Sequence, residues 1–174
     1  MIGEIRDTET AQIAVQASIT GHLVVSTLHT NSSAATITRL IDMGIESYLL
    51  ADSMVGIIAQ RLVRRLCPDC RREHIATVKE KELLGIHSAE EVKIYEAVGC
   101  PRCNNTGYYG RIGVYEIMTI TPQLKTMISK QVSSDALRDE AVAEGMHTLR
   151  MSAAQLVEDG VTTVSEMLRV SFEN

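Results

Sequence analysis

Four cysteines are the residues whose type and spacing most clearly indicate chemistry. They form two Cys-x-x-Cys pairs, Cys67 with Cys70 and Cys100 with Cys103. Each pair can present two thiolates from one tight turn, and four thiolates suit tetrahedral zinc. Because four protein ligands leave no open position for water or a substrate, the spacing predicts a structural zinc ion rather than a catalytic one. Redox-active dithiols and unmetallated core cysteines are the alternatives.

Five arginines lie in the same part of the sequence, and they can offset the charge of about −2 on a zinc ion with four thiolates. They are Arg64, Arg65, Arg71, Arg72 and Arg102. A free-standing zinc module that binds a protein or nucleic-acid partner through this basic rim is the alternative function. The formal net charge of −5 argues against a protein that coats nucleic acid, so we expect no nucleic-acid partner.

Glu4, His22 and His29 are the other candidates for chemistry. Glu4 follows Ile2-Gly3, where a buried strand would end. The carboxyl ends of strands form the usual ligand face of an open α/β sheet, so a carboxylate there can meet a ligand. Taken one at a time, each of these residues is as readily explained as a surface or structural residue.

The first part of the chain alternates between helix and strand patterns, which is typical of an α/β layer fold with a parallel sheet. Apolar spacing predicts helices over residues 8–19, 33–43 and 47–59, and β-branched runs predict strands over residues 22–28 and 61–66. Asp7 or Thr8 can cap the first helix, and Gly21 ends it.

The second part of the chain is polar at first and then helical. Residues 71–99 are charged, with a short helix expected over 78–84, and residues 107–118 suggest a hairpin or a bent strand. Helices are expected from Pro122 onward, and Pro122 suits a first helical position. The expected caps are Ser134, Thr148 and a capping box formed by Thr163 and Glu166.

The composition describes a globular protein. The chain has 174 residues, of which 45% are hydrophobic, and this is enough for one domain and an appendage. The sequence has no apolar run near the ~18 residues of a membrane-spanning helix, and its first residues do not resemble a cleavable signal. We therefore expect a cytoplasmic location.

Several segments together resemble the ATPases that drive type II secretion and type IV pilus assembly. The segment Gly3-Glu4-Ile5-Arg6-Asp7 resembles their Walker B end, and residues 20–24 with 26–31 resemble their histidine box. The resemblance continues through residues 59–64, the four cysteines, residues 107–113 and residues 163–170, so it covers essentially the whole chain. The cysteines favour an extension or secretion motor over a retraction motor.

The resemblance implies a role for each candidate residue. The family's Walker B glutamate polarises the water that attacks magnesium-bound ATP, and this implies a catalytic Glu4. The histidine box contacts the γ-phosphate, which implies that His29 and, less directly, His22 bind the nucleotide. The resemblance also implies ATP and Mg²⁺ as cofactors of the intact protein, a hexameric ring, an inner-membrane platform protein as partner, and a cytoplasmic position at the inner membrane.

One departure from the family pattern sets a limit on activity. The 174 residues contain no G-x-x-x-x-G-K-[ST], the loop whose amides and lysine bind the phosphates. We therefore expect a C-terminal fragment that is inactive alone and that self-associates differently from the native ring, because a sheet is cut. The expected domains are the C-terminal half of a RecA-like core over residues 1–66, a tetracysteine zinc subdomain over 67–106, and a hairpin with a helical C-terminal subdomain over 107–174.

Overall fold

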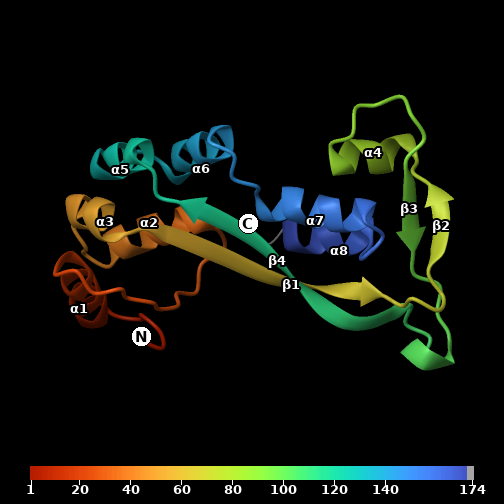
Figure 1. Ribbon diagram of the computed structural model, residues 1–174, viewed down its shortest axis with the longest axis horizontal. Helices are drawn as coiled ribbons and strands as arrows, with labels where there is room; N and C mark the ends of the chain where they lie inside the picture. Colours follow the sequence, from red (N-terminus) through yellow and green to blue (C-terminus); the bar gives the residue numbers. More distant parts are fainter. Residues whose placement is uncertain (172–174) are drawn as a thin grey trace. The chain divides into compact units, whose positions relative to one another are not determined.

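The chain divides into two compact units (Figure 1). The structure, a computed structural model, describes residues 1–171. Unit 1 comprises Met1–Ala59 and Glu116–Met146, and unit 2 comprises Gln60–Tyr115 and the residues from His147 onward. Both units draw on segments that are distant in the sequence.

Unit 1 consists mainly of helices that pack in pairs. They are α1 (Thr8–Ile19), α2 (Ser33–Asp42), α3 (Ser47–Ser53), α5 (Pro122–Ser129) and α6 (Ser134–Ala143). Helix α3 packs on α5, and α2 packs on α6. Their buried faces carry Ile37, Leu50, Leu124, Ile128 and Leu137, each at most 1% exposed. The core that positions the candidate site is therefore aliphatic.

Local capping explains where the helices of unit 1 begin. The Asp7 side chain accepts a hydrogen bond from the Thr10 amide at 2.8 Å, so Asp7 caps α1, whose predicted bounds are confirmed. Ser32 caps α2 by accepting from the Ala35 amide at 3.2 Å. Pro122 is at the start of α5, as expected. The expected cap Ser134 is wrong by one residue, because Ser133 accepts from the Ala136 amide.

The strand predicted over residues 22–28 does not form as a regular strand. This segment is extended and runs in the same direction as residues 2–5, with hydrogen bonds from the Ile2 amide to the Val25 carbonyl at 2.9 Å and from the Ile5 amide to the Thr27 carbonyl at 3.0 Å. Val24 and Leu28 of this segment pack against the core, whereas Leu23 is 82% exposed. The β-branched run thus has one partner segment where a buried parallel strand has two.

The helix predicted over residues 47–59 is wrong in its second half. Helix α3 ends at Ser53, and β1 (Gly56–Leu66) begins five residues before the predicted strand. β1 pairs with β4 (Tyr108–Thr119), so of the hairpin and the bent strand expected over residues 107–118 the structure has a single strand, which begins at Tyr108. A Cβ atom at Gly56 would lie 3.3 Å from the Met118 carbonyl oxygen, and this close approach favours glycine where the pairing starts.

Unit 2 contains a small antiparallel sheet and three α-helices besides the rest of β1 and β4. Strand β2 (Arg72–Ile75) pairs with β3 (Lys93–Glu96) in the register that places Arg72 opposite Glu96. Helix α4 (Val78–Leu84) lies between them in sequence and has the predicted bounds, with a capping box of Thr77 and Glu80. Helices α7 (Leu149–Glu158) and α8 (Val164–Ser171) pack together, and Thr148 caps α7 as expected.

Only one of the two hydrogen bonds of the capping box expected at Thr163 and Glu166 forms. The Glu166 amide donates to Thr163 Oγ1 at 3.4 Å, but the Glu166 carboxylate does not return to the Thr163 backbone. The Glu166 carboxylate is buried and accepts hydrogen bonds from the Arg64 amide at 2.7 Å and from Arg64 Nε at 3.0 Å. A charge-assisted pair with a guanidinium is stronger than a neutral cap, and this explains the difference.

Candidate functional site

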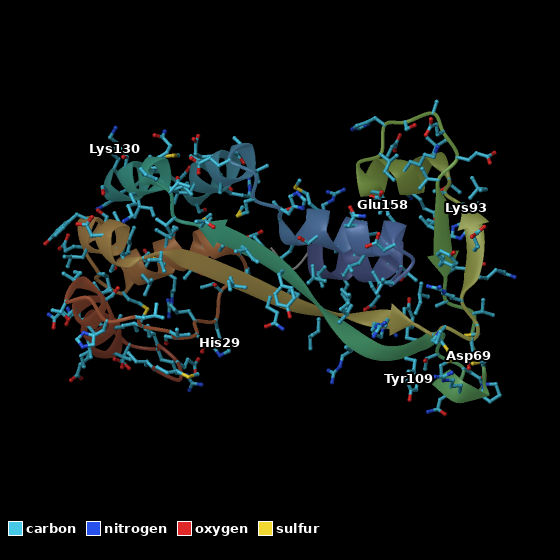
Figure 2. All side chains as sticks on the ribbon, viewed as in Figure 1. His29, Asp69, Lys93, Tyr109, Lys130 and Glu158 are labelled. Carbon is cyan, nitrogen blue, oxygen red and sulfur yellow. The ribbon has the colours of Figure 1, made fainter. Side chains whose placement is uncertain are left out.

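Glu4 and His29 meet in unit 1. Glu4 Oε1 lies 2.8 Å from His29 Nε2, and Glu4 Oε2 lies 2.7 Å from Arg6 Nη2. The paired segments 2–5 and 25–27 position these side chains, and Thr27 Oγ1 adds a hydrogen bond to the Gly3 carbonyl at 2.8 Å. His29 lies on the loop before α2 and its side chain is 87% exposed (Figure 2). A ligand can therefore reach His29 from solvent.

The Glu4 carboxyl is held in its ionised form. The hydrogen bond from Arg6 is the largest cause that lowers its pKa below the ordinary value of 4.5; partial burial opposes the shift, and the charges of Arg6 and His29 add to it. Among the described residues, Glu4 Oε1 is buried and makes no hydrogen bond of good geometry, although it lies 2.8 Å from His29 Nε2. An ionised carboxylate with a spare acceptor can orient a water molecule or hold a cation.

His22 contacts other residues than Glu4 and His29. Its Nδ1 atom is 3.2 Å from Thr20 Oγ1 and 3.3 Å from the Ala17 carbonyl oxygen, at the end of α1. The structure thus brings Glu4 and His29 together, and it adds Arg6, which the sequence analysis quoted only as part of a motif. Arg6 stands two residues from Glu4 on an extended segment, and this spacing places both side chains on one side of the chain.

The four cysteine sulfurs gather at one place in unit 2. All four Sγ atoms lie within 4.8 Å of one another. The Cys67–Cys100 and Cys70–Cys103 distances are 3.8 Å, and the Cys100–Cys103 distance is 3.7 Å. A tetrahedron with Zn–S bonds of about 2.3 Å has edges of about 3.8 Å, whereas disulfide sulfurs are about 2.05 Å apart. The four cysteines can therefore bind a metal ion, and their spacing does not fit disulfides.

Tight turns on both sides aim backbone amides at these sulfurs. Gly99 donates to Cys70 Sγ at 3.3 Å, and Cys100 and Gly107 each donate to Cys103 Sγ at 3.2 Å. Gly99 has a φ of 121°, and a Cβ there would lie 2.8 Å from the Asn105 carbonyl oxygen, so the turn requires glycine. Such amides stabilise thiolates, the form in which cysteine binds metal.

The thiols differ in acidity because their surroundings differ. Burial is the largest influence on both Cys70 and Cys103 and favours the neutral thiol. It raises the pKa of Cys70 to about 12. At Cys103 the amides of Cys100 and Gly107 outweigh burial, and the pKa falls to about 6. These amides thus favour the thiolate form of Cys103.

Four of the five arginines near the cysteines are engaged within unit 2. Arg102 pairs with Asp69 at 2.8 Å, Arg72 pairs with Glu96 at 2.6 Å, and Arg71 donates to the Gly160 carbonyl at 2.7 Å. Arg64 binds Glu166, as described above. Asp69 and Tyr109 mark this region in Figure 2, and the Arg102 guanidinium lies 5.3 Å from the Tyr109 ring.

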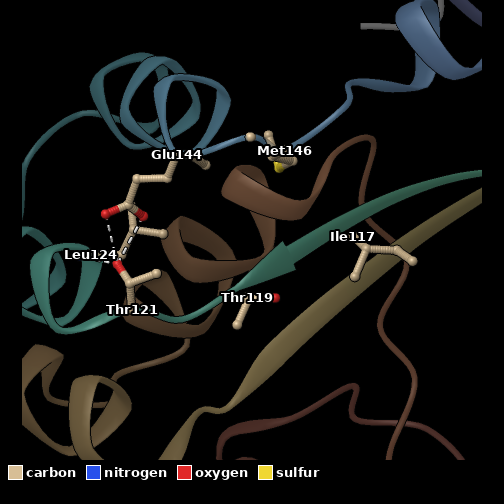
Figure 3. A pocket seen from close by; sticks show the side chains of 8 residues that line it. Ile117, Thr119, Thr121, Leu124, Glu144 and Met146 are labelled. Atoms are coloured by element: carbon tan, nitrogen blue, oxygen red, sulfur yellow. Dashed lines mark hydrogen bonds between the residues drawn. The ribbon is translucent and has the colours of Figure 1, made fainter.

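Unit 1 also contains a small pocket of about 130 Å³ near the end of β4 (Figure 3). It is lined by Ile117, Thr119, Thr121, Leu124, Ala141, Glu144, Gly145 and Met146. The Glu144 carboxylate accepts the Thr121 hydroxyl at 2.8 and 3.1 Å. None of the predicted site residues lines it, so the candidate site lies elsewhere.

No helix within residues 1–171 is long and apolar enough to cross a membrane.

Curated relatives resemble nearly the whole of this chain. It is 44% identical over 174 residues to the type II secretion system ATPase E of Vibrio cholerae, covering 100% of this chain and 34% of that protein. It is 42% identical over 174 residues to the type IV pilus assembly ATPase TfpB of Acinetobacter baylyi, covering 98% of this chain and 29% of the relative. The chain thus spans about a third of the length of these relatives.

A solved structure shows the same fold. The Yersinia pseudotuberculosis ATPase DotB matches with a TM-score of 0.66 and 22% identity, over 99% of this chain and 36% of that one. This match confirms the expected α/β fold. The family model described as "Type II/IV secretion system protein" matches residues 1–169. Because that match covers nearly all of the sequence, the chain belongs to the type II/IV secretion system protein family.

Proposed function

We propose that this chain is the C-terminal part of a hexameric ATPase that powers type II secretion or type IV pilus assembly. The observation that carries the proposal is the meeting of Glu4 Oε1 and His29 Nε2 at 2.8 Å, on segments that are separated in sequence, in a chain of this family. The relatives' printed names support an ATPase and both biological systems, and the shared third of their length supports a part of a longer protein.

In this proposal Glu4 polarises the attacking water and His29 contacts the γ-phosphate of ATP. Phosphoryl transfer depends mainly on positioning and on neutralising charge, so an ionised carboxylate and an exposed imidazole are suitable groups. Arg6 would keep the carboxylate oriented while His29 meets the phosphate. Mg²⁺ and the glycine-rich phosphate loop would complete the site, and the loop would come from sequence outside residues 1–174. His22, by its place at the end of α1, would have a minor or indirect role.

The four cysteines would hold a structural zinc ion. Their sulfur distances fit a tetrahedron, and three backbone amides already point at Cys70 and Cys103. Zinc would stabilise a polar region that buries little apolar surface, because binding free energy adds to folding free energy there. Cys67, at the end of β1, and Cys100, at the start of the turn Pro101–Cys103, would be joined through the ion.

The remaining parts of the proposal concern organisation. Residues 1–66 would form the C-terminal half of the RecA-like core, residues 67–106 the zinc subdomain, and residues 107–174 the C-terminal subdomain. The intact protein would act at the cytoplasmic side of the inner membrane on a platform protein. The isolated chain would lack turnover and could self-associate in a non-native way.

The test is steady-state ATP hydrolysis by the full-length product of the gene that encodes this sequence. Glu4→Gln keeps the shape of the side chain and removes its charge, so we expect kcat to fall by about 10²-fold or more. Glu9→Gln is the matched control, because Glu9 is an exposed acid in the first turn of α1. ATP hydrolysis that Glu4→Gln leaves intact would contradict the proposed role of Glu4.

A further inference from the structure

A buried carboxylate on β4 contacts the helix that follows the His29 loop. Glu116 is only 4% exposed, and its Oε1 atom accepts a hydrogen bond from the Ser33 amide at 2.9 Å and another from the Ser33 hydroxyl. Ser33 is the first residue of α2 and is fully buried. Met146 packs on the same hydroxyl, with its sulfur 3.7 Å away. All of these residues belong to unit 1.

The contact satisfies what the start of a helix requires. The first amides of a helix have no partner within it, and its N-terminus carries a partial positive charge. The Ser32 hydroxyl accepts a hydrogen bond from the Ala35 amide, and the Glu116 carboxylate accepts one from the Ser33 amide, which the Ser32 cap does not bind. Burying a carboxylate is costly without such partners, so Glu116 and the start of α2 hold each other in one arrangement.

This arrangement fixes one end of the loop that carries His29. The other end is fixed by Thr27, whose hydroxyl donates to the Gly3 carbonyl, and by the close contact between Glu4 and His29. Between them, Thr30 Oγ1 and Thr36 Oγ1 lie 2.8 Å apart and join the loop to the first turn of α2. His29 stands four residues before Ser33, so this anchor confines it to about 14 Å at full extension and less in a folded loop.

We propose that Glu116 is a positioning residue for the nucleotide site: by holding the start of α2 it places His29 beside Glu4 and toward the γ-phosphate. This inference rests on the proposed function, in which His29 contacts that phosphate. Glu116 touches neither nucleotide nor metal in this account. Its effect should therefore fall on the recognition of the γ-phosphate and spare the rest of the nucleotide.

The experiment measures the affinity of the full-length protein for a non-hydrolysable ATP analogue and for ADP. In Glu116→Ala we expect the affinity for the analogue to fall about tenfold, as for the loss of one charged hydrogen bond, while that for ADP stays within about twofold. A merely structural loss would weaken both nucleotides alike. Glu116→Asp keeps the negative charge on a shorter side chain, so the carboxylate lies farther from Ser33. This variant should fold, and its affinity for the analogue should still fall several-fold.

Glu144→Ala is the matched control, since Glu144 binds the Thr121 hydroxyl at the start of α5 in the same unit and should leave both affinities unchanged. An analogue-to-ADP preference that survives in both Glu116 variants would overturn the inference. The His29→Ala variant separates the two claims. If His29→Ala keeps the preference, the proposed role of His29 is wrong; if only the Glu116 variants keep it, the positioning role alone is wrong.

Discussion

Replacing Arg64 by alanine should destabilise unit 2 through the buried carboxylate of Glu166. That side chain is 2% exposed and accepts from Arg64 Nε at 3.0 Å, from Arg64 Nη2 at 2.9 Å and from Arg169 Nη2 at 3.0 Å. The variant would remove the first two contacts and would keep those from Arg169 and from the backbone amide of residue 64. It would also remove the guanidinium that lies 3.9 Å from the centre of the Tyr108 ring.

The magnitude follows from these contacts. Breaking a buried ion pair costs about 3–5 kcal/mol when one charge is left without compensation. Arg64 is 50% exposed, and Arg169 still compensates Glu166, so water and the second arginine reduce the effect. We expect the free energy of unfolding to fall by about 2 kcal/mol, including roughly 0.5–1 kcal/mol from the cation–π contact.

Urea unfolding followed by tyrosine fluorescence is the assay, because four of the five tyrosines belong to unit 2 and the chain has no tryptophan. Arg65→Ala, next to Arg64 on β1, is the matched control and should cost less than about 0.5 kcal/mol. In a Glu166→Gln background, Arg64→Ala should cost less than it does alone, since the buried charge is gone. Equal effects of Arg64→Ala and Arg65→Ala would refute this reasoning.

Two further predictions concern unit 2. At Glu166, burial acts to raise the pKa, but the hydrogen bonds and charge of Arg64 outweigh it and lower the pKa below the ordinary 4.5. The stability that this group contributes is therefore complete above pH 4.5 and is lost as the pH falls through the lower pKa of the folded state. Urea midpoints measured from pH 7 to 3 should show a smaller loss in Arg64→Ala than in the wild type. Protein purified without chelator should contain close to one zinc per chain by elemental analysis, and Cys103→Ser should reduce this content and expose residues 67–106 to protease; a metal-free wild-type protein would contradict the zinc proposal.

Local sequence signals predicted the elements that depend on local contacts. Helix α4 is capped by Thr77 together with Glu80 in its first turn and is followed by Gly85 in a left-handed conformation, and α1 follows Asp7, so both have their predicted bounds. The helix predicted to continue through Ala59 failed because pairing with β4 decides the conformation of residues 56–59, and no local signal describes that pairing. Tertiary contacts override propensity at such positions.

The candidate site shows the same division. The Cys-x-x-Cys spacing predicted the cysteine cluster because both pairs are short-range patterns, while family resemblance, and no spacing rule, indicated Glu4 and His29. Glu116 escaped notice because its partner Ser33 is 83 residues away in sequence. Glu166 was assigned to a helix cap, and its partner Arg64 on β1 is 102 residues away. Contacts of this kind appear only once the chain is folded.

Trapping of ATP by the full-length protein is the most direct measurement of the central claim, that Glu4 acts on the attacking water in an ATPase. Labelled ATP is mixed with wild-type protein and with Glu4→Gln, and bound ATP and ADP are separated after several turnovers. The account predicts that Glu4→Gln binds ATP as tightly as wild type and retains it unhydrolysed, while wild type carries mostly ADP. ADP appearing at the same rate in both proteins would contradict the account.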